Sequence, residues 1–259
     1  MYPYWIEIGS FKLPTFGPMV VLGFLAAHFV MKRELPRIGV DPELSTSLIT
    51  AGIVGGLVGA KLYFVIFELP TWATWSDTFS ALFSGSGLTW HGGFAVATLA
   101  VIWTIRRHVA PLPQVADVVG LGLALGYAIG RIGCQLAGDG DYGVPTDLPW
   151  AMTYPNGVVP TTNLVHPVPV YETLMGLAAF VLLWFTRCAL AVRPGLSFAL
   201  YLILAGTSRF AVEFIRLNAK VLMCLTGAQL FSLGMIVTGA VIAIRLLRRS
   251  PSVAVGEAR

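Results

Sequence analysis

Seven long apolar runs constrain the fold of this chain more than any other feature. They lie near residues 14–31, 46–67, 92–105, 116–138, 168–186, 196–217 and 226–246. A helix that crosses a bilayer needs about 20 consecutive, mostly apolar residues. Most runs have that length, and the run at 92–105 reaches it with a few polar neighbours. The pattern therefore predicts an all-α integral membrane protein with seven transmembrane helices.

Composition agrees with this interpretation. Hydrophobic residues make up 56% of the chain and charged residues 12%, against roughly 25% charged residues in a soluble domain. The net charge of only +4 excludes the strongly basic surface of a nucleic-acid-binding protein, so no nucleic-acid partner is expected. Residues 1–10 contain no positive segment of the signal-peptide type, so the first run is expected to be a retained helix.

The positions of the basic residues predict the orientation, because short cytoplasmic loops carry excess Lys and Arg. Eleven of the 17 basic residues follow the first, third, fifth and seventh runs: Lys32, Arg33, Arg37, Arg106, Arg107, Arg187, Arg193, Arg245, Arg248, Arg249 and Arg259. The loops at 68–90 and 139–167 contain no Lys or Arg. We therefore expect a single domain over 1–259 with an outside amino terminus, a cytoplasmic carboxyl terminus and a cap formed by the two long outside loops.

The other six basic residues are the candidates for function: Lys12, Lys61, Arg131, Arg209, Arg216 and Lys220. A charge inside an apolar helix is costly, and such residues usually have a partner or line a site. At 1.5 Å per residue, Lys61, Arg131 and Arg209 are expected about 10 Å below the outer boundary of the membrane. A structural pair with a buried carboxylate is the alternative explanation for Arg131.

Further polar residues stand at the predicted outer ends of other helices. His91 begins the third helix, where an interfacial histidine is the alternative to a catalytic one, and Glu172 lies one turn into the fifth. Arg209, Glu213 and Arg216 have spacings of four and seven, which predicts a ladder on one helix face. Such a ladder also fits a purely structural role, and Asp139 and Asp141 also fit solvated turn residues.

Four segments thus bring cations, a histidine and carboxylates to the depth of an anionic phospholipid headgroup. A lipid or anion transporter is an alternative for such a cluster. In a transporter, however, polar residues should continue toward the inner face, and the inner halves of these helices are almost purely apolar. The asymmetry favours a site that is open to the outside and to lipid.

Several short motifs, in this order, resemble those of the bacterial phosphatidylglycerol–prolipoprotein diacylglyceryl transferase family. They are Gly-Ala-Lys-Leu-Tyr at 59–63, His91-Gly92-Gly93, Gly130-Arg131-Ile132-Gly133 with Gly138, His166-Pro167 through Tyr171-Glu172, and Arg209-Phe210 with Glu213 and Arg216. The resemblance implies a seven-helix enzyme of the bacterial inner membrane with a periplasmic site and no cofactor. Its reaction would move diacylglyceryl from phosphatidylglycerol to the lipobox cysteine of a prolipoprotein, and glycerol phosphate would leave.

The chain departs from the family pattern in places. Cys134, Gln135, Ala137 and Asp139 stand where the family has Asn-Phe-x-Asn-Gly-Glu, and Phe16 replaces a tyrosine. A relative that uses another acceptor and an inactive lipid-binding relative are therefore alternatives. Cys134 is either a small packed residue or, in a two-step reaction, an alkyl-accepting nucleophile.

The predicted mechanism assigns a role to each candidate. Arg131 and Arg209 clamp the phosphate, His91 takes the proton of the acceptor thiol, and Glu172 and Glu213 orient the arginines. No metal is expected, because the His and Cys residues lack ligand spacing. The candidates for substrate binding are Lys61, Gly92, Gly93, Gly138, Asp139, Tyr142, His166, Tyr171 and Arg216.

Overall fold

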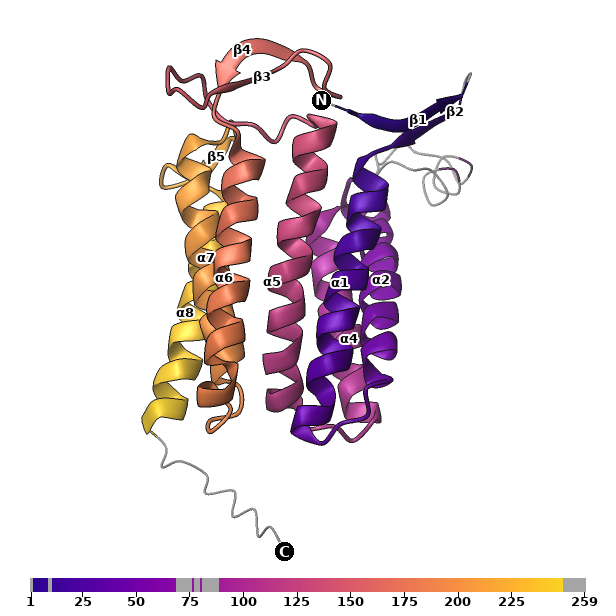
Figure 1. The fold of residues 1–259 in the computed structure, drawn as a ribbon, viewed down its shortest axis with the longest axis vertical. Coiled ribbons are helices and arrows are strands. Elements are labelled where there is room, and N and C mark those ends of the chain that lie inside the picture. The colour runs from indigo at the N-terminus through magenta and orange to yellow at the C-terminus, as the bar shows by residue number, and fades with distance from the viewer. Residues whose placement is uncertain (1, 9–10, 69–75, 77–79, 81–88, 249–259) are drawn as a thin grey trace, which may run out of the picture. The chain divides into compact units, whose positions relative to one another are not determined.

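The computed structural model describes residues 2–8, 11–68, 76, 80 and 89–248. Within these residues the chain is mainly helical (Figure 1). The seven α-helices found there are α1 (Phe16–Glu34), α2 (Leu44–Tyr63), α4 (Trp90–Arg107), α5 (Leu112–Ala137), α6 (Val168–Leu190), α7 (Leu196–Val212) and α8 (Gly227–Arg248). Each α-helix coincides with one of the seven apolar runs, which confirms the predicted helices.

Six of these helices are long and apolar enough to cross a membrane, namely α1, α2, α5, α6, α7 and α8. This supports the predicted all-α membrane protein. The exception is α4, which has 18 residues and a length of about 27 Å. His91, Arg106 and Arg107 stand near its two ends, so its apolar stretch is short, and a seventh span stays a prediction.

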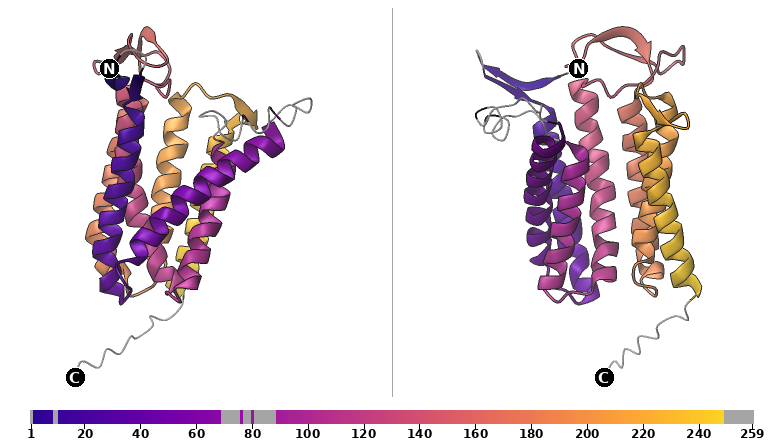
Figure 2. Two further views of the ribbon diagram at one scale, coloured as in Figure 1. Left: turned by 90° about the vertical axis from the view of Figure 1, so that its right-hand side faces the viewer. Right: turned by 180° about the vertical axis from the view of Figure 1, so that it is seen from behind.

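The chain divides into two compact units. Unit 1 contains residues 1–31 and 116–259, and unit 2 contains residues 32–115. In unit 1, α7 packs against both α6 and α8, and Figures 1 and 2 show these three helices running alongside one another. The unit has an apolar core drawn from α1, α5 and α6: Val30, Leu121, Ala124 and Leu183.

Unit 2 consists mainly of α2 and α4, which pack closely. Their contact depends on small residues, because a Cβ at Gly59 would lie 2.3 Å from the carbonyl oxygen of Gly92, and a Cβ at Gly92 would lie 2.3 Å from that of Gly59. At this point the two backbones touch with no room for side chains. The described residues of the unit also include two short irregular turns, the 3₁₀ turn η1 (Leu35–Ile38) and the π-turn η2 (Phe64–Glu68).

Three short antiparallel hairpins, which were not predicted, lie among the described residues of unit 1. They are β1 (Tyr4–Ile8) with β2 (Phe11–Pro14), β3 (Met152–Tyr154) with β4 (Thr161–Val165), and β5 (Lys220–Leu222) with β6 (Leu225–Thr226). The β3–β4 hairpin pairs Met152 with Val165 and Tyr154 with Thr161, and it gives structure to the predicted outside loop at 139–167. Most of the other predicted cap, at 68–90, and Arg249 and Arg259 lie outside the described residues.

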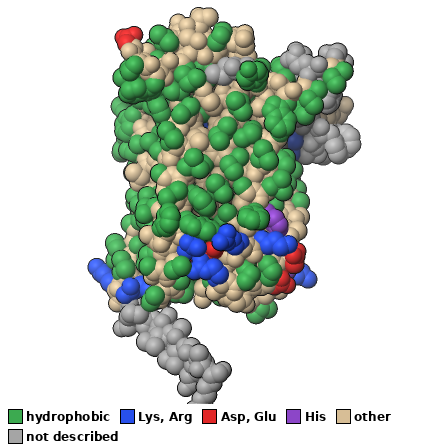
Figure 3. Space-filling view, viewed as in Figure 1, with side chains coloured by type: hydrophobic (Ala, Val, Ile, Leu, Met, Phe, Trp, Pro, Cys, Tyr) green, Lys and Arg blue, Asp and Glu red, His purple; other side chains and the backbone are tan. Residues whose placement is uncertain are grey.

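Basic residues occupy the last turns of several helices, as the loop analysis predicted. Within unit 1 they are Arg187 of α6 and Arg245 and Arg248 of α8. Within unit 2 they are Lys32 and Arg33 at the end of α1 and Arg106 and Arg107 at the end of α4. Figure 3 shows hydrophobic side chains over the middle of the helices and Lys and Arg side chains at helix ends.

Candidate active site

Two charged residues of unit 1 are deeply buried, Glu172 and Glu213. Glu172 is only 1% exposed. Three arginines surround it: Arg131 Nε lies 3.1 Å from Oε2, Arg209 Nη1 lies 3.0 Å from Oε1, and Arg216 Nη1 lies 3.4 Å from Oε2. The Tyr127 hydroxyl donates a hydrogen bond of 2.8 Å to Oε1. The predicted pairing of Glu172 with an arginine is therefore confirmed, with three partners instead of one.

Local sequence explains how these groups meet. Tyr127 and Arg131 are four residues apart on α5, so they lie one turn apart on the same face, and the Arg131 guanidinium stands 5.2 Å from the centre of the Tyr127 ring. Pro169 lies at the start of α6, where a missing N–H costs no helix hydrogen bond. Glu172 therefore falls in the second turn, at the end of the helix that the arginines reach.

A second buried carboxylate, Glu213, joins the same network. Its Oε2 lies 2.9 Å from Arg209 Nη2 and 3.8 Å from Arg216 Nε. Its Oε1 accepts hydrogen bonds from the Asn218 amide at 2.6 Å and the Thr226 hydroxyl at 2.8 Å. Glu172 of α6 and Glu213, directly after α7, thus both contact the arginines of the network.

The expected helical ladder needs a correction at its last member. α7 ends at Val212, residues Glu213–Ile215 form the 3₁₀ turn η3, and Arg216 is extended with φ −88° and ψ 158°. The chain leaves the helix here because its backbone pairs with the loop after α5: Val144 N–H donates to the Ile215 carbonyl at 2.8 Å. Arg216 therefore joins the network from an extended segment and not from the face of a helix.

The third carboxylate of the network is Asp141, in the loop after α5. It forms ion pairs with Arg131 and with Arg216, and its side chain is 27% exposed. Burial acts to raise the pKa of Asp141, but the adjacent guanidinium groups of Arg131 and Arg216 outweigh it and lower the pKa. Asp141 is therefore not the solvated turn residue that the sequence left open, but an ionised partner of two arginines.

The loop that carries Asp141 begins as the sequence predicted, directly after Gly138. This glycine has φ +60°, and a Cβ on it would lie 2.8 Å from Gly157 Cα in the β3–β4 connection, so both its conformation and its neighbour require glycine. Tyr142 stacks on Tyr154, with ring centroids 5.1 Å apart. Gly138 and Tyr142 therefore have structural contacts, and their role toward a substrate stays a prediction.

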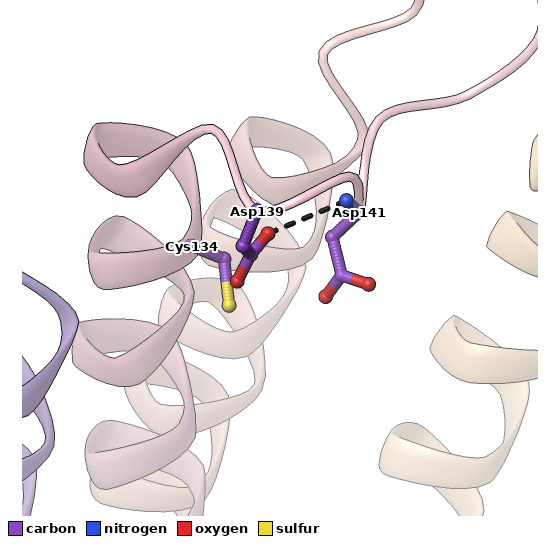
Figure 4. A group of neighbouring side chains, drawn as sticks. All are labelled: Cys134, Asp139 and Asp141. Atoms are coloured by element: carbon purple, nitrogen blue, oxygen red, sulfur yellow. Dashed lines mark hydrogen bonds between the residues drawn. The ribbon is translucent and has the colours of Figure 1, made fainter. Parts of the chain in front are cut away.

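Asp139 and Asp141 lie near Cys134, the buried thiol one turn beyond Arg131. Figure 4 shows the three side chains pointing to the same side of the loop, with the Asp141 N–H donating to Asp139 Oδ1 at 3.3 Å. One donor atom from each lies within 4.8 Å of the others, so the three meet in space although their sequence spacing does not suggest a metal site. Two arginines hold Asp141, and their charge opposes a dication there, so this group fits a metal poorly.

His166 and Tyr171 form a polar cap in unit 1. The Tyr171 hydroxyl accepts a hydrogen bond of 2.8 Å from Trp150 Nε1 and lies 3.2 Å from His166 Nδ1. The His166 backbone also pairs with Gly143 and Val144. These contacts connect the start of α6 to the loop of Asp141.

Four of the predicted site residues belong to unit 2. His91 is an exposed side chain in the first turn of α4, with its ring centroid 5.5 Å from Trp90 and 6.0 Å from Tyr63. Lys61 is half-buried in the last turn of α2. Gly92 and Gly93 are buried against α2, so the structure gives them a packing role, and their contact with a substrate stays a prediction.

Sequence reasoning missed four members of the network: Tyr127, Asp141, Asn218 and Thr226. Tyr127 carried a usable signal, because a tyrosine one turn before an intramembrane arginine is placed to contact it. Asp141, Asn218 and Thr226 lie in irregular segments, where sequence spacing does not determine distance. Only the packing of these segments brings Asp141 to the arginines and brings Asn218 and Thr226 to Glu213.

The network joins three guanidinium groups, Arg131, Arg209 and Arg216, to three carboxylates, Glu172, Glu213 and Asp141, at one end of membrane-spanning helices. Guanidinium forks match the oxygens of a phosphate. The fold and this network together define a multi-pass membrane protein with a site suited to an anionic group.

Comparison with known proteins identifies the family. The family model of prolipoprotein diacylglyceryl transferase matches residues 3–245. Proteins named phosphatidylglycerol–prolipoprotein diacylglyceryl transferase are 33% identical in Gloeobacter violaceus (96% of this chain, 94% of the relative) and 30% identical in Clostridium tetani (92% and 95%). A third, from Leptospira interrogans, is 32% identical (80% and 72%). The chain belongs to the prolipoprotein diacylglyceryl transferase family.

Proposed function

We propose that this membrane enzyme transfers the diacylglyceryl group of phosphatidylglycerol to the lipobox cysteine thiol of a prolipoprotein and releases glycerol phosphate. Family membership supports the reaction. One structural observation carries the assignment of the site: three arginines converge on Glu172, at the end of apolar helices. A phosphodiester headgroup is the lipid group that such donors recognise best.

The reaction breaks the bond between the glyceryl carbon and the phosphate oxygen and forms a carbon–sulfur bond. The thiolate supplies the electron pair, and the departing glycerol phosphate gains a negative charge. Arg131 and Arg209 bind the phosphate and stabilise that developing charge, because their donors are fixed before the reaction by Glu172 and Glu213. Arg216 and Lys61 are further contacts for the anion.

The thiol proton goes to His91, the candidate general base of unit 2. Imidazole ordinarily exchanges protons near neutral pH, and a free cysteine needs a base because its pKa is about 8.5. The exposed position of His91 in the first turn of α4 leaves its ring accessible. Gly92, Gly93, Gly138, Asp139, Tyr142, His166 and Tyr171 complete the proposed substrate contacts.

We infer further that all seven helices cross the bacterial inner membrane as one transferase domain, with the network facing the periplasm. The basic residues at the opposite helix ends, among them Arg187 and Arg245, support this orientation. Cysteine accessibility to an impermeant thiol reagent tests it. In intact cells, and with the exposed native Cys188 and Cys224 replaced by serine, a cysteine placed at Val158 in the β3–β4 connection should react, and one placed at Val192 after α6 should not.

The decisive experiment for the function is mass spectrometry of a lipobox peptide after incubation with the purified full-length protein and phosphatidylglycerol vesicles. The peptide mass should increase by one diacylglyceryl group. Arg131→Ala should lower the rate by about 1,000-fold, the order expected for loss of a group that stabilises transition-state charge. Arg187→Ala, an arginine in the last turn of α6, is the matched control and should keep the wild-type rate.

Two results would contradict the proposal. An unchanged peptide mass with the wild-type protein would reject the reaction. Equal rates for Arg131→Ala and Arg187→Ala, with product formed, would place the chemistry outside the network of Glu172.

A further inference from the structure

The positive and negative charges of the network balance without a substrate. A phosphate that binds there must therefore replace one of the negative groups. Three guanidinium groups face three carboxylates, and the donors of each arginine contact at least two of these acids. An additional anion would meet a neutral cluster and gain little electrostatic energy. Binding therefore requires that one carboxylate leave its arginines.

The three carboxylates differ in how firmly they are held. The Glu172 and Glu213 side chains are 1% and 0% exposed, whereas the Asp141 side chain is 27% exposed. Each glutamate also accepts hydrogen bonds from neutral groups, from Tyr127 at Glu172 and from Asn218 and Thr226 at Glu213. A buried carboxylate with several hydrogen bonds is costly to move, so Asp141 is the acid that leaves most easily.

The position of Asp141 also matches that of a bound phosphodiester. One oxygen contacts Arg131 Nη1 and the other contacts Arg216 Nη2, so the carboxylate bridges two guanidinium groups as two phosphate oxygens would. Both groups carry one negative charge. Replacement of Asp141 by a phosphodiester leaves the network neutral, with three arginines against two glutamates and one phosphate.

The backbone permits this exchange. Gly138 is fixed against the β3–β4 connection, since Val159 N–H donates to its carbonyl at 2.9 Å, and Gly143 N–H donates to the His166 carbonyl at 2.9 Å. Between these two fixed points stands Gly140 with φ +91°. The partly exposed side chain of Asp141 can turn outward while the ends of its short segment stay in place.

We propose that Asp141 is a placeholder for the phosphate: it occupies the two-arginine position in the free enzyme and yields it to the phosphodiester of the lipid. This inference rests on the proposed function for the identity of the lipid, but not for the exchange of anions. After transfer, glycerol phosphate carries nearly two negative charges at neutral pH. The return of Asp141 then restores the neutral network and favours release of the product.

Anion binding tests the placeholder without turnover. Inorganic phosphate is titrated into the purified full-length protein by calorimetry, and the dissociation constants of variants are compared. Asp141→Asn removes the competing charge and should bind phosphate at least about fivefold more tightly, because a larger fraction of the protein is then competent to bind. Asp141→Glu keeps a carboxylate and should stay within about twofold of wild type.

Asp147→Asn is the matched control, because Asp147 is an exposed aspartate of the same loop, and its affinity for phosphate should not change. Kinetics give a second measurement, in which Asp141→Asn should lower the KM for phosphatidylglycerol. If Asp141 were instead a permanent partner that orients the arginines, Asp141→Asn would weaken phosphate binding and raise KM. Unchanged or weaker binding overturns the proposal.

Failure of Asp141→Asn to fold would also overturn the proposal, because a side chain that leaves in every cycle is not required for the fold. Failure of the proposed function looks different. In that case wild-type protein forms no lipidated peptide, while Asp141→Asn still binds inorganic phosphate more tightly than wild type does.

Discussion

A carboxylate accepts hydrogen bonds at each end of α7 in unit 1, but the donors at the two ends are of different kinds. At its start, Asp117 of α5 accepts two backbone hydrogen bonds of 2.7 Å, from Gly195 N–H and Phe198 N–H. At its end, Glu172 of α6 accepts from the guanidinium groups of Arg131, Arg209 and Arg216. Asp117 satisfies helix N–H groups that have no partner within the helix, and Glu172 balances charge.

The start of α7 therefore has a structural role, whereas its end belongs to the candidate active site. Backbone donors cannot turn away, so Asp117 fixes the start of α7 to α5 and has nothing to exchange. Arginine donors sit on long side chains and carry charge, so an anion that they hold without further hydrogen bonds, such as the partly exposed Asp141, can be exchanged. The following predictions, from the largest expected effect to the smallest, test whether the two ends of α7 really differ in this way.

Glu172→Gln should have the largest effect. It leaves three arginines with two acids, and loss of one partner from a buried ion pair costs about 3–5 kcal/mol. The midpoint of thermal unfolding should fall by several degrees, and the rate of peptide lipidation should fall by about 100-fold. Glu43→Gln is the control, because Glu43 pairs with Lys32 in an exposed ion pair that contributes at most about 1 kcal/mol. Equal losses of stability and of lipidation rate in the two variants would show that Glu172 contributes no more than an exposed ion pair does.

Asp117→Ala should affect stability alone. Loss of a helix-capping carboxylate costs about 0.5–2 kcal/mol, so the unfolding midpoint should fall by a few degrees while the turnover of the folded protein is preserved. Thermal unfolding and turnover are measured on the same preparation. A loss of turnover larger than the loss of folded protein would show that the start of α7 is coupled to the site.

Tyr127→Phe should have a moderate effect that is confined to the site. It removes the hydrogen bond that the Tyr127 hydroxyl donates to the Glu172 carboxylate. A hydrogen bond to a charged group contributes about 1.5–3 kcal/mol. The three arginines stay in place, so we expect a loss of about tenfold in kcat with little change in KM. The result would contradict a supporting role for Tyr127 if KM rose while kcat stayed constant.

Asp139→Asn should give the smallest effect, and one that depends on pH. Burial, and then repulsion by Asp141, raise the pKa of Asp139. Because its pKa in the folded protein exceeds that in the unfolded chain, ionised Asp139 lowers stability at neutral pH, and this penalty disappears as the pH falls through the folded-state pKa. The variant should therefore unfold at a slightly higher temperature than wild type at pH 7, and the difference should disappear below the ordinary aspartate pKa of about 3.9. A difference that is independent of pH would exclude this explanation.

Much of the site could be predicted because several of its members are charged residues within apolar helices. Arg131 and Glu172 stood out as costly residues in apolar runs, and a charge there must find a partner. The position of Arg216 could not be predicted in the same way. Its spacing from Arg209 fits a helix, but the backbone leaves the helix at Glu213 to pair with residues 143 and 144, and no local pattern encodes a pairing that distant.

The sequence by itself determined the helices, the membrane environment and the identity of the charges that need partners, because hydrophobic length and periodicity are local properties of the chain. The tertiary structure decided which carboxylate meets which arginine. Asp139 and Asp141 look alike in the sequence, two residues apart in a glycine-rich loop. Only Asp141 bridges Arg131 and Arg216, because the loop is fixed at Gly138 and Gly143 by segments far away in the sequence.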